Sequence, residues 1–143
     1  MEAMEAKTDY QPLLKSLGLK STPKRLAMLE MLDGEQAYLS PEDIWKKLKR
    51  RFKSIGLPTI YRNLEELEGK NVITKVIHPN RQLYYYFCRH SSHHHHFVCI
   101  SCKKVQDFTS CAVADIEREI RDKIKGKVVS HIFQVNGLCR ECV

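Results

Sequence analysis

Two Cys-x-x-Cys pairs constrain the fold of this 143-residue chain more than any other feature of its sequence. They are Cys99-Ile-Ser-Cys102 and Cys139-Arg-Glu-Cys142. A spacing of two residues lets one tight turn direct two thiolates at a single ion, and two such turns complete a tetrahedral zinc site made of four cysteines. Because 36 residues separate the two pairs, a unit of strand, helix and strand must lie between them. The pairs therefore predict a structural Zn²⁺ that stabilises a small α/β domain.

The placement of the other soft ligands supports metal binding in the C-terminal half. All six Cys and all seven His follow residue 77. The N-terminal residues contain no apolar segment of the kind found in export signals, so we expect a cytoplasmic location, where disulfides are rare. A unit of about 50 residues rarely has a stable core without a metal, a disulfide or a partner chain. We therefore expect metal to stabilise this half.

Composition narrows the class of protein. Apolar residues make up 43% of the chain and charged residues 29%, which is typical of a soluble globular protein. No apolar run approaches the roughly 20 residues of a membrane helix, so no membrane partner is expected. The formal net charge of +7 favours a polyanionic partner, but only the placement of the charges can identify one.

The first half of the chain contains helix signals and then a hairpin. Proline just inside the start and glycine at the end mark most of the helices. The expected helices are 10–17, Thr22-Pro23 to Gly34, Ser40-Pro41 to Gly56, and Pro58-Thr59 to Gly69, followed by strands 72–77 and 83–88 around the turn 79–82. This order predicts a winged helix-turn-helix whose recognition helix is 58–69. On that helix we expect Arg62, Asn63, Glu65 and Glu66 to face outward.

A polar break separates the two halves. We expect a winged-helix DNA-binding domain over 1–88, a hinge at 89–92, and a zinc-stabilised dimerisation and metal-sensing domain over 93–143. Within the second domain the pattern predicts strands 93–100, 104–108 and 128–135, with a helix at about 112–125. The predicted fold class is therefore α/β (α+β).

Four consecutive histidines, His93 to His96, lead directly into the first strand of the second domain. Successive side chains of a strand point to opposite faces, so His94 and His96 share one face and His93 and His95 the other. The tetrad could then serve two metal sites, although a solvated polar stretch is the alternative. Candidates for the remaining ligands are Cys88 on one face and His131 on the other, with His78 and Asp107 as further donors.

Basic and aromatic residues near the predicted recognition helix suggest contacts to DNA. Arg62 can bond guanine bidentately, and Tyr61 can pack on a thymine methyl, with core packing as an equal alternative for Tyr61. Six Lys and Arg residues within 46–53 could contact phosphates, or could form a solvated helix face.

Taken together, these motifs resemble the ferric uptake regulator (Fur) superfamily of metal-dependent repressors. The resemblance extends from about Leu14 to Cys142. It rests on the stretches 18–25, Ser40-Pro-Glu-Asp43, 56–62, 93–102, Ser130-His131 and 137–142. It implies a winged helix, a C-terminal dimerisation domain, a structural zinc, a homodimer and double-stranded operator DNA as partner. By the same resemblance, Lys20 reaches the minor groove, while Tyr61 and Arg62 enter the major groove, with Thr59 also among the DNA-binding residues.

The sensing site departs from the family's iron-type pattern. Tyr38, Tyr86 and Ala114 stand where the family often has a His, an acid and a Glu. The position of Cys88, five residues before the histidine tetrad, resembles the pattern of the zinc uptake regulator (Zur) branch. Thr74, however, stands where that branch commonly has an Asp.

On this basis we predict two regulatory metal sites. The sensing site comprises His78, Cys88, His94 and His96, whose thiolate and imidazoles suit Zn²⁺ better than Mn²⁺ or Fe²⁺. A possible further site comprises His93, His95 and His131, and we expect it to be weak unless Cys111 or Asp115 supplies a fourth ligand.

The predicted function is a metal-dependent transcriptional repressor, zinc-responsive, in which metal sets the dimer for a palindromic operator. An iron-responsive or peroxide-sensing regulator of the same family is the main alternative, and a DNA-binding module with only a structural zinc is a more remote one. A zinc hydrolase or deaminase is disfavoured because the chain has neither HExxH nor HxE paired with PCxxC, so we expect no enzymatic activity.

Overall fold

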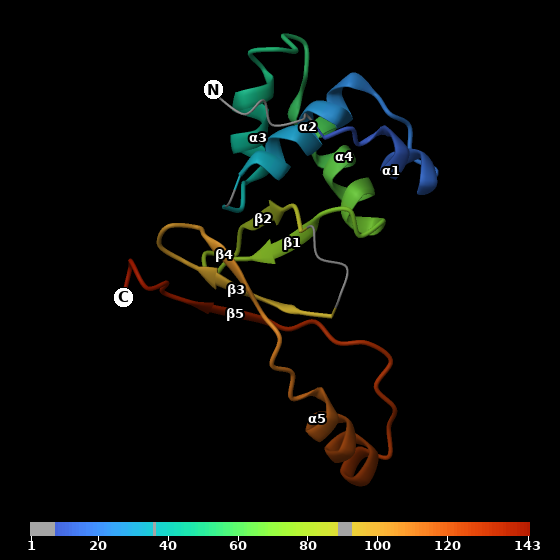
Figure 1. Cartoon of the computed structure of the whole chain (residues 1–143), viewed down its shortest axis with the longest axis vertical. Coiled ribbons are helices and arrows are strands. Elements are labelled where there is room, and N and C mark those ends of the chain that lie inside the picture. The colour runs from blue at the N-terminus through green and yellow to red at the C-terminus, as the bar shows by residue number, and fades with distance from the viewer. Residues whose placement is uncertain (1–7, 36, 89–92) are drawn as a thin grey trace, which may run out of the picture. The chain divides into compact units, whose positions relative to one another are not determined.

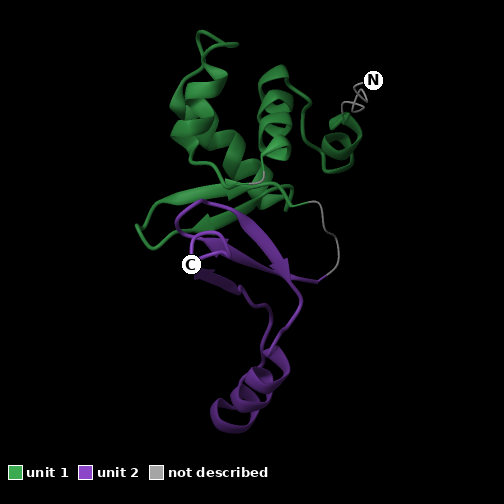
Figure 2. Cartoon of the chain, turned by 60° about the vertical axis from the view of Figure 1, so that its left-hand side comes forward, with its two compact units in different colours: residues 1–88 green, residues 89–143 purple. Residues whose placement is uncertain are grey.

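The computed structural model describes residues 8–35, 37–88 and 93–143 (Figure 1). The chain divides into two compact units, residues 1–88 and residues 89–143 (Figure 2). The predicted hinge at 89–92 lies outside the described residues. No helix among the described residues is long and apolar enough to span a membrane.

The first unit contains four helices: α1 (Gln11–Ser16), α2 (Pro23–Gly34), α3 (Pro41–Leu48) and α4 (Leu57–Gly69). The expected caps are formed. Thr22 Oγ1 accepts a hydrogen bond from the Arg25 amide at 3.2 Å. Ser40 and Asp43 form a reciprocal capping box at the start of α3. Each such cap stabilises a helix by about 1 kcal/mol, so these short polar segments determine where α2 and α3 begin.

The helices of the first unit enclose one apolar core. Leu29 on α2, Ile44 on α3, and Ile60 and Leu64 on α4 are all fully buried in it. Burying a side chain of this size contributes about 1.5–3 kcal/mol. The burial of these four residues holds α4, the predicted recognition helix, against α2 and α3.

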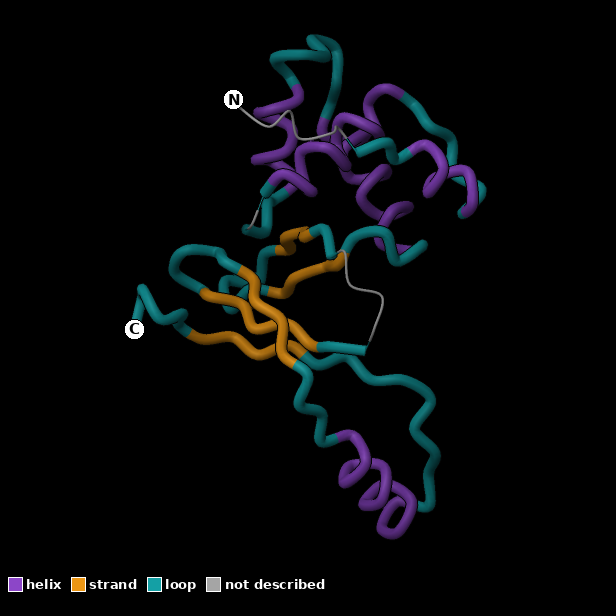
Figure 3. The backbone as a smooth tube through the Cα atoms, in the orientation of Figure 1, coloured by secondary structure: helices purple, strands orange, loops and turns teal. Residues whose placement is uncertain are grey.

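A short antiparallel hairpin completes the first unit as a winged helix. Its strands are β1 (Thr74–Ile77) and β2 (Leu83–Tyr86), and Leu39 adds an antiparallel bridge to Tyr85 (Figure 3). Both strands are shorter than predicted. Val72 and Ile73 are buried but precede the strand pairing, and β2 ends at Tyr86 instead of residue 88.

Two other expectations for this unit were wrong. The third helix ends at Leu48 instead of Gly56, because the chain turns at residues 49–51 and Trp45 Nε1 donates to the Ile55 carbonyl at 3.0 Å. Asn63 does not face outward but is buried, with only 7% of its surface exposed. Its hydrogen bonds compensate for that burial, as described below.

The second unit is a small α/β domain. Its strands are β3 (His95–Cys99), β4 (Val105–Phe108) and β5 (Gln134–Gly137), in the order β4-β3-β5. β3 pairs antiparallel with β4 and parallel with β5. The helix α5 (Val113–Glu119) continues as a π-helical turn over Ile120–Ile124. The chain thus has the predicted mixed fold of a winged helix followed by a small α/β domain.

The last strand begins later than its sequence suggests. Residues 128–133 were expected to open it, but they lie outside any strand and are drawn as loop in Figure 3. Val129 and Ile132 are 92% and 97% exposed. Among the described residues of this unit, no other segment pairs with 128–133, so the β-branched residues there have no partner to make them a strand.

Candidate metal centres and nucleic-acid interface

The sheet of the second unit brings the two Cys-x-x-Cys turns together. Because β3 and β5 are parallel neighbours, their carboxyl ends meet at one edge, where Cys99 pairs in register with Gly137. The Cys102 and Cys139 sulfurs lie 3.6 Å apart, and the sulfurs of the four-cysteine cluster (Cys99, Cys102, Cys139 and Cys142) lie within 4.8 Å of one another. Tetrahedral Zn–S bonds of about 2.3 Å place sulfurs about 3.8 Å apart, so the cluster fits one Zn²⁺.

Gly137 permits the close approach of β3 and β5. A Cβ atom at this position would lie 3.0 Å from Cε2 and Cζ of the Phe97 ring, closer than side chains normally pack. A larger residue would require the Phe97 ring to shift and would disturb the contact between the two strands beside the four-cysteine cluster. The glycine two residues before the second Cys pair therefore supports the site's geometry.

Backbone amides prepare Cys99 to bind a cation. The amides of Cys102 and Cys139 donate to its sulfur at 3.5 and 3.4 Å. These hydrogen bonds lower the pKa of the Cys99 thiol to about 6. A hydrogen bond with Cys139 raises the pKa of Cys142. The cluster therefore holds a thiolate at Cys99 at neutral pH, which is the form that binds zinc.

The imidazoles of His94, which immediately precedes β3, and His96, on β3, lie on the same side of the chain. Their Nε2 atoms lie 3.2 Å apart. Across the β3–β4 register, Asp107 pairs with His96, and its Oδ1 lies 3.5 Å from His96 Nε2. Cys88 is the last residue of the first unit, so its membership of this site stays a prediction.

His78 lies at the base of the wing turn, where its ring packs 5.5 Å from the ring of Tyr84. Its Nδ1 accepts a hydrogen bond from the Asn80 amide at 3.1 Å. A metal at Nδ1 would have to replace this hydrogen bond. Tyr38, which stands where the family often has a ligand, is fully buried and packs edge-on against Tyr84 at 4.8 Å. Tyr38 therefore belongs to the core.

The opposite face of β3 carries the second histidine group. Ligand atoms of His93, His95, His131 and Cys111 lie within 4.8 Å of one another, and Cys111 Sγ is 3.8 Å from His131 Nε2. His95 is buried, and its Nε2 has no hydrogen-bond partner among the described residues. Burial, together with neighbouring His93 and His131, lowers the pKa of His95. A buried, neutral imidazole nitrogen without a partner is a group that a metal ion would satisfy.

The fourth donor of this group is a thiol. Of the two residues considered from sequence, Cys111 lies in the group, whereas Asp115 is exposed on α5 and lies 3.7 Å from Arg118. Cys111 precedes α5 by two residues, and His131 follows that helix. The chain turns back after the helix, so that Cys111 and His131 both lie close to His95. The spacing of these residues in the sequence does not predict this proximity.

The predicted DNA-reading residues lie on or near the first turns of α4. Tyr61 and Arg62 are exposed, and Thr59 is half-buried. The Tyr61 hydroxyl donates to Glu42 Oε1 at 2.7 Å, a hydrogen bond that raises the pKa of Tyr61. Tyr61 is exposed, so the alternative interpretation of this residue, packing in the core, was wrong.

Three of the basic residues between 46 and 53 have local partners. Lys47 pairs with Glu35 at 2.7 Å. Lys49 lies over the Trp45 ring, and Arg51 lies over the Phe52 ring. These contacts orient the cationic side chains but leave Lys47, Lys49 and Arg51 exposed, so the surface remains positively charged.

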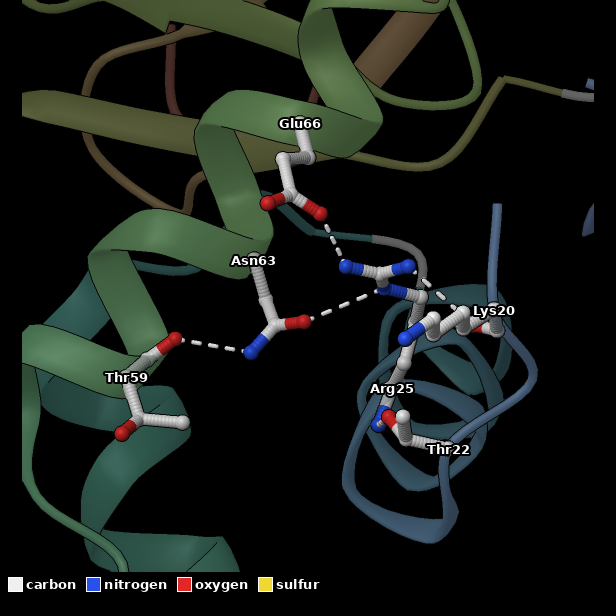
Figure 4. Close-up of polar contacts among 6 residues, drawn as sticks. All are labelled: Lys20, Thr22, Arg25, Thr59, Asn63 and Glu66. Atoms are coloured by element: carbon white, nitrogen blue, oxygen red, sulfur yellow. Dashed lines mark hydrogen bonds and ion pairs between the residues drawn. The ribbon is translucent and has the colours of Figure 1, made fainter. Parts of the chain in front are cut away.

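A polar network connects α2 with α4 and was not found from the sequence (Figure 4). Arg25 Nε donates to Asn63 Oδ1 at 3.1 Å, and Arg25 Nη1 donates to the Lys20 carbonyl at 3.1 Å. The Arg25 guanidinium also pairs with the Glu66 carboxylate. Asn63 Nδ2 in turn donates to the Thr59 carbonyl at 2.8 Å. The only sequence signal was Arg25 at the end of the stretch 18–25 that carries the family resemblance.

Comparison with known proteins identifies the relatives of this chain. The model of the "Ferric uptake regulator family" matches residues 16–136. The Ferric uptake regulation protein of Escherichia coli K12 is 32% identical over 136 residues, which cover 94% of this chain and 90% of the relative. The Peroxide operon regulator of Bacillus subtilis is 29% identical over 142 residues, which cover 99% and 96%.

Solved structures show the same fold. The ferric uptake regulator of Helicobacter pylori superposes with a TM-score of 0.65 at 26% identity, covering 92% of this chain and 87% of the other. A zinc uptake regulator solved with zinc and DNA superposes with a TM-score of 0.74 at 21% identity, covering 92% and 88%. At that identity the second likeness concerns the fold alone.

Proposed function

Because the chain belongs to the ferric uptake regulator family, whose members are metal-responsive DNA-binding regulators and not enzymes, we propose that it is a zinc-responsive repressor. The observation that carries the choice of zinc is the donor set. The face proposed for sensing carries His94 and His96, whose Nε2 atoms lie 3.2 Å apart, and the group around His95 combines three imidazoles with the Cys111 thiol. Thiolate and imidazole donors favour Zn²⁺ over Fe²⁺ and Mn²⁺, which prefer oxygen-rich sites.

The four-cysteine cluster would hold the structural zinc. Its four thiols leave no open position for an exchanging ligand, and they clamp the ends of β3 and β5. Because the second unit has few buried side chains of its own, this zinc would supply much of its stability.

The sensing site would use the His94–His96 face of β3. The 3.2 Å separation of the two Nε2 atoms and the nearby Asp107 carboxylate support a metal at this face. We assign Cys88 and His78 as its remaining ligands. If His78 binds through Nδ1, it exchanges the Asn80 hydrogen bond for the metal, which would link metal occupancy to the conformation of the wing turn.

The second group, comprising His93, His95, His131 and Cys111, would bind a further zinc. The orphaned Nε2 of His95 supports this assignment, and Cys111 supplies the fourth donor that the three histidines lack. The ligands come from either side of α5, so this zinc would fix the helix to the sheet.

The first unit would bind double-stranded DNA. The exposed Tyr61 and Arg62 can enter the major groove, with Thr59 at the start of the same helix. Lys20 is exposed on the segment before α2 and can reach the minor groove. The basic surface between residues 46 and 53 would contact phosphates and give a salt-dependent affinity.

A second copy of the chain would cover the apolar surface beside α5. A pocket of about 190 Å³ there is lined by Ile116, Val128 and Phe133, among others, and Ile132 is almost fully exposed. An exposed apolar segment with strand-forming residues is typical of an intermolecular contact. The resulting homodimer would present two α4 helices to a palindromic operator, and metal would favour the DNA-binding arrangement by population shift.

The test is metal-dependent DNA binding with metal analysis on the same sample. A palindromic duplex selected from random sequence by the zinc-loaded protein serves as the probe. We expect one zinc to survive dialysis against a moderate chelator, at least one other to leave, and operator affinity to fall with the departing metal. Equal affinity with and without the chelator would contradict metal sensing.

The same assay separates the alternatives. Two relatives are a Ferric uptake regulation protein and a Peroxide operon regulator, so iron and peroxide sensing are the second candidates. Restoration of binding by Fe²⁺ or Mn²⁺ but not by Zn²⁺ would favour iron. Loss of binding on peroxide treatment of the iron-loaded protein would favour peroxide sensing.

A further inference from the structure

We propose that Arg25 is a positioning residue that joins the two DNA-reading parts of the winged helix, the Lys20 segment and α4. This inference rests on the proposed DNA-binding function. Arg25 itself is only 7% exposed, so it acts through its neighbours and not by touching DNA. Its guanidinium lies between the residues 20–22 segment and α4 and is directed at α4 (Figure 4).

The guanidinium makes contacts in three directions. Nη1 bonds the carbonyl of Lys20, Nε bonds Asn63, and Nη2 pairs with Glu66. Only arginine offers this planar fork of five donors, because lysine has a single ammonium at the end of a flexible stem. The Lys20 backbone is therefore held by the same group that holds the middle of α4.

Asn63 extends the connection to the first turn of α4. It receives the Arg25 hydrogen bond through Oδ1 and donates from Nδ2 to the Thr59 carbonyl. Lys20 and Thr59, both predicted to face DNA, are thus linked through two buried side chains. A fixed spacing between a minor-groove residue and a major-groove helix is what recognition of one DNA site requires.

Removing the negative charge of Glu66 tests the network, because the two possible roles of Glu66 predict opposite effects on DNA binding. The Glu66 side chain is 43% exposed, so Glu66→Gln should fold normally. If Glu66 were only a negative charge near DNA, its removal would strengthen binding to every duplex. If it holds Arg25 in place, binding to the selected operator weakens by about 3–10-fold while binding to a scrambled duplex does not weaken.

A double-mutant cycle tests the link to Lys20. Lys20→Ala and Arg25→Lys are combined in zinc-loaded protein, and affinities for the selected and scrambled duplexes are measured by fluorescence anisotropy. If Arg25 positions Lys20, the Lys20→Ala loss becomes at least about 3-fold smaller in the Arg25→Lys background. Independent effects that multiply would overturn the proposal, as would an Arg25→Lys variant that keeps the wild-type preference for the selected duplex.

Controls separate this proposal from the proposed function. Arg121→Lys changes an exposed arginine in the other unit and should leave both affinities unchanged. If wild-type protein shows no metal-dependent preference for any duplex, the proposed function fails. If wild type and Arg121→Lys show that preference but Glu66→Gln binds both duplexes more tightly, the positioning role of Arg25 fails alone.

Discussion

The Nε2 atoms of His94 and His96 lie 3.2 Å apart where the chain enters β3. Two imidazoles this close, with the Asp107 carboxylate 3.5 Å from the second, form a set of donors that a divalent cation can bridge. The arrangement depends on the alternation of a strand, in which residues two apart share a face.

Replacing one of these imidazoles should remove the exchangeable zinc. We expect His96→Ala to lower the affinity for that zinc by at least about 100-fold. Replacing a residue that only hydrogen-bonds to a metal ligand already costs 10–100-fold in metal affinity. The zinc of the four-cysteine cluster should remain. Titration against a competing chelator measures both, with Gln106→Ala on β4 as the control that should keep wild-type affinity. Unchanged zinc content in His96→Ala would exclude this face as a metal site.

Zinc should protect Cys111 from alkylation. The thiol is only partly buried, and a metal shared with His95 and His131 would occupy its nucleophilic electron pair. We expect zinc to slow iodoacetamide labelling of Cys111 by about tenfold or more, as measured by mass spectrometry. His131→Ala should abolish the protection. If zinc leaves the labelling rate of Cys111 unaltered, Cys111 is not a ligand.

Zinc binding at the four-cysteine cluster should release a pH-dependent number of protons. Since the pKa of Cys99 is lowered to about 6, this thiol is already ionised at pH 7.5, and zinc displaces about three protons. As pH falls through about 6, Cys99 gains a proton, and zinc displaces about four. Zinc affinity therefore falls more steeply with acidification below pH 6 than above it. Calorimetry of chelator-treated protein, in buffers of different ionisation enthalpy, counts these protons.

The Cys111→Ser variant is the matched control for that count, because Cys111 lies outside the four-cysteine cluster. It should release the same number of protons at this site. A count of four at both pH 7.5 and pH 5.5 would show that Cys99 is not ionised before zinc binds.

A charge in the exposed apolar segment should prevent dimerisation. Ile132 is 97% exposed, so Ile132→Glu costs the isolated chain little but would bury an unpaired carboxylate in a dimer. We expect the dissociation constant of the dimer to rise by at least about 100-fold, equivalent to roughly 3 kcal/mol. Analytical ultracentrifugation at matched zinc measures it, with Lys127→Gln as the control, because it makes the same change of one unit in net charge at an exposed position. A variant that still dimerises with wild-type affinity would move the interface elsewhere.

Loss of the Asn63 amide should destabilise the first unit. Asn63→Ala leaves the buried Arg25 guanidinium without one partner, which costs about 1–3 kcal/mol in the free energy of unfolding. Urea denaturation measures this cost. The exposed Asn136→Ala should change stability by less than about 0.5 kcal/mol. An equally small effect at Asn63 would mean that the network does not stabilise the packing of α2 on α4.

Much of the fold could be predicted because its signals are local. Thr22 and Ser40 cap helices through hydrogen bonds to amides three residues away, so their role is readable from the chain. The Cys pairs are equally local, since a turn of four residues determines each one. Strand ends were less predictable. Residues 128–133 have the composition of a strand, but strand formation requires a neighbour, which this unit does not provide among its described residues.

The sequence alone determined the winged helix, the paired Cys turns and the two faces of the histidine tetrad, because helix caps, turns and strand alternation depend on residues only a few positions apart. Tertiary structure decided which distant groups meet. The parallel pairing of β3 with β5 unites the Cys pairs, the return of the chain after α5 brings His131 to Cys111, and the packing of α2 on α4 buries Asn63 against Arg25. These contacts join residues 20 to 40 positions apart in the chain, and only the packing of whole elements, driven by burial of their apolar faces, brings such residues together.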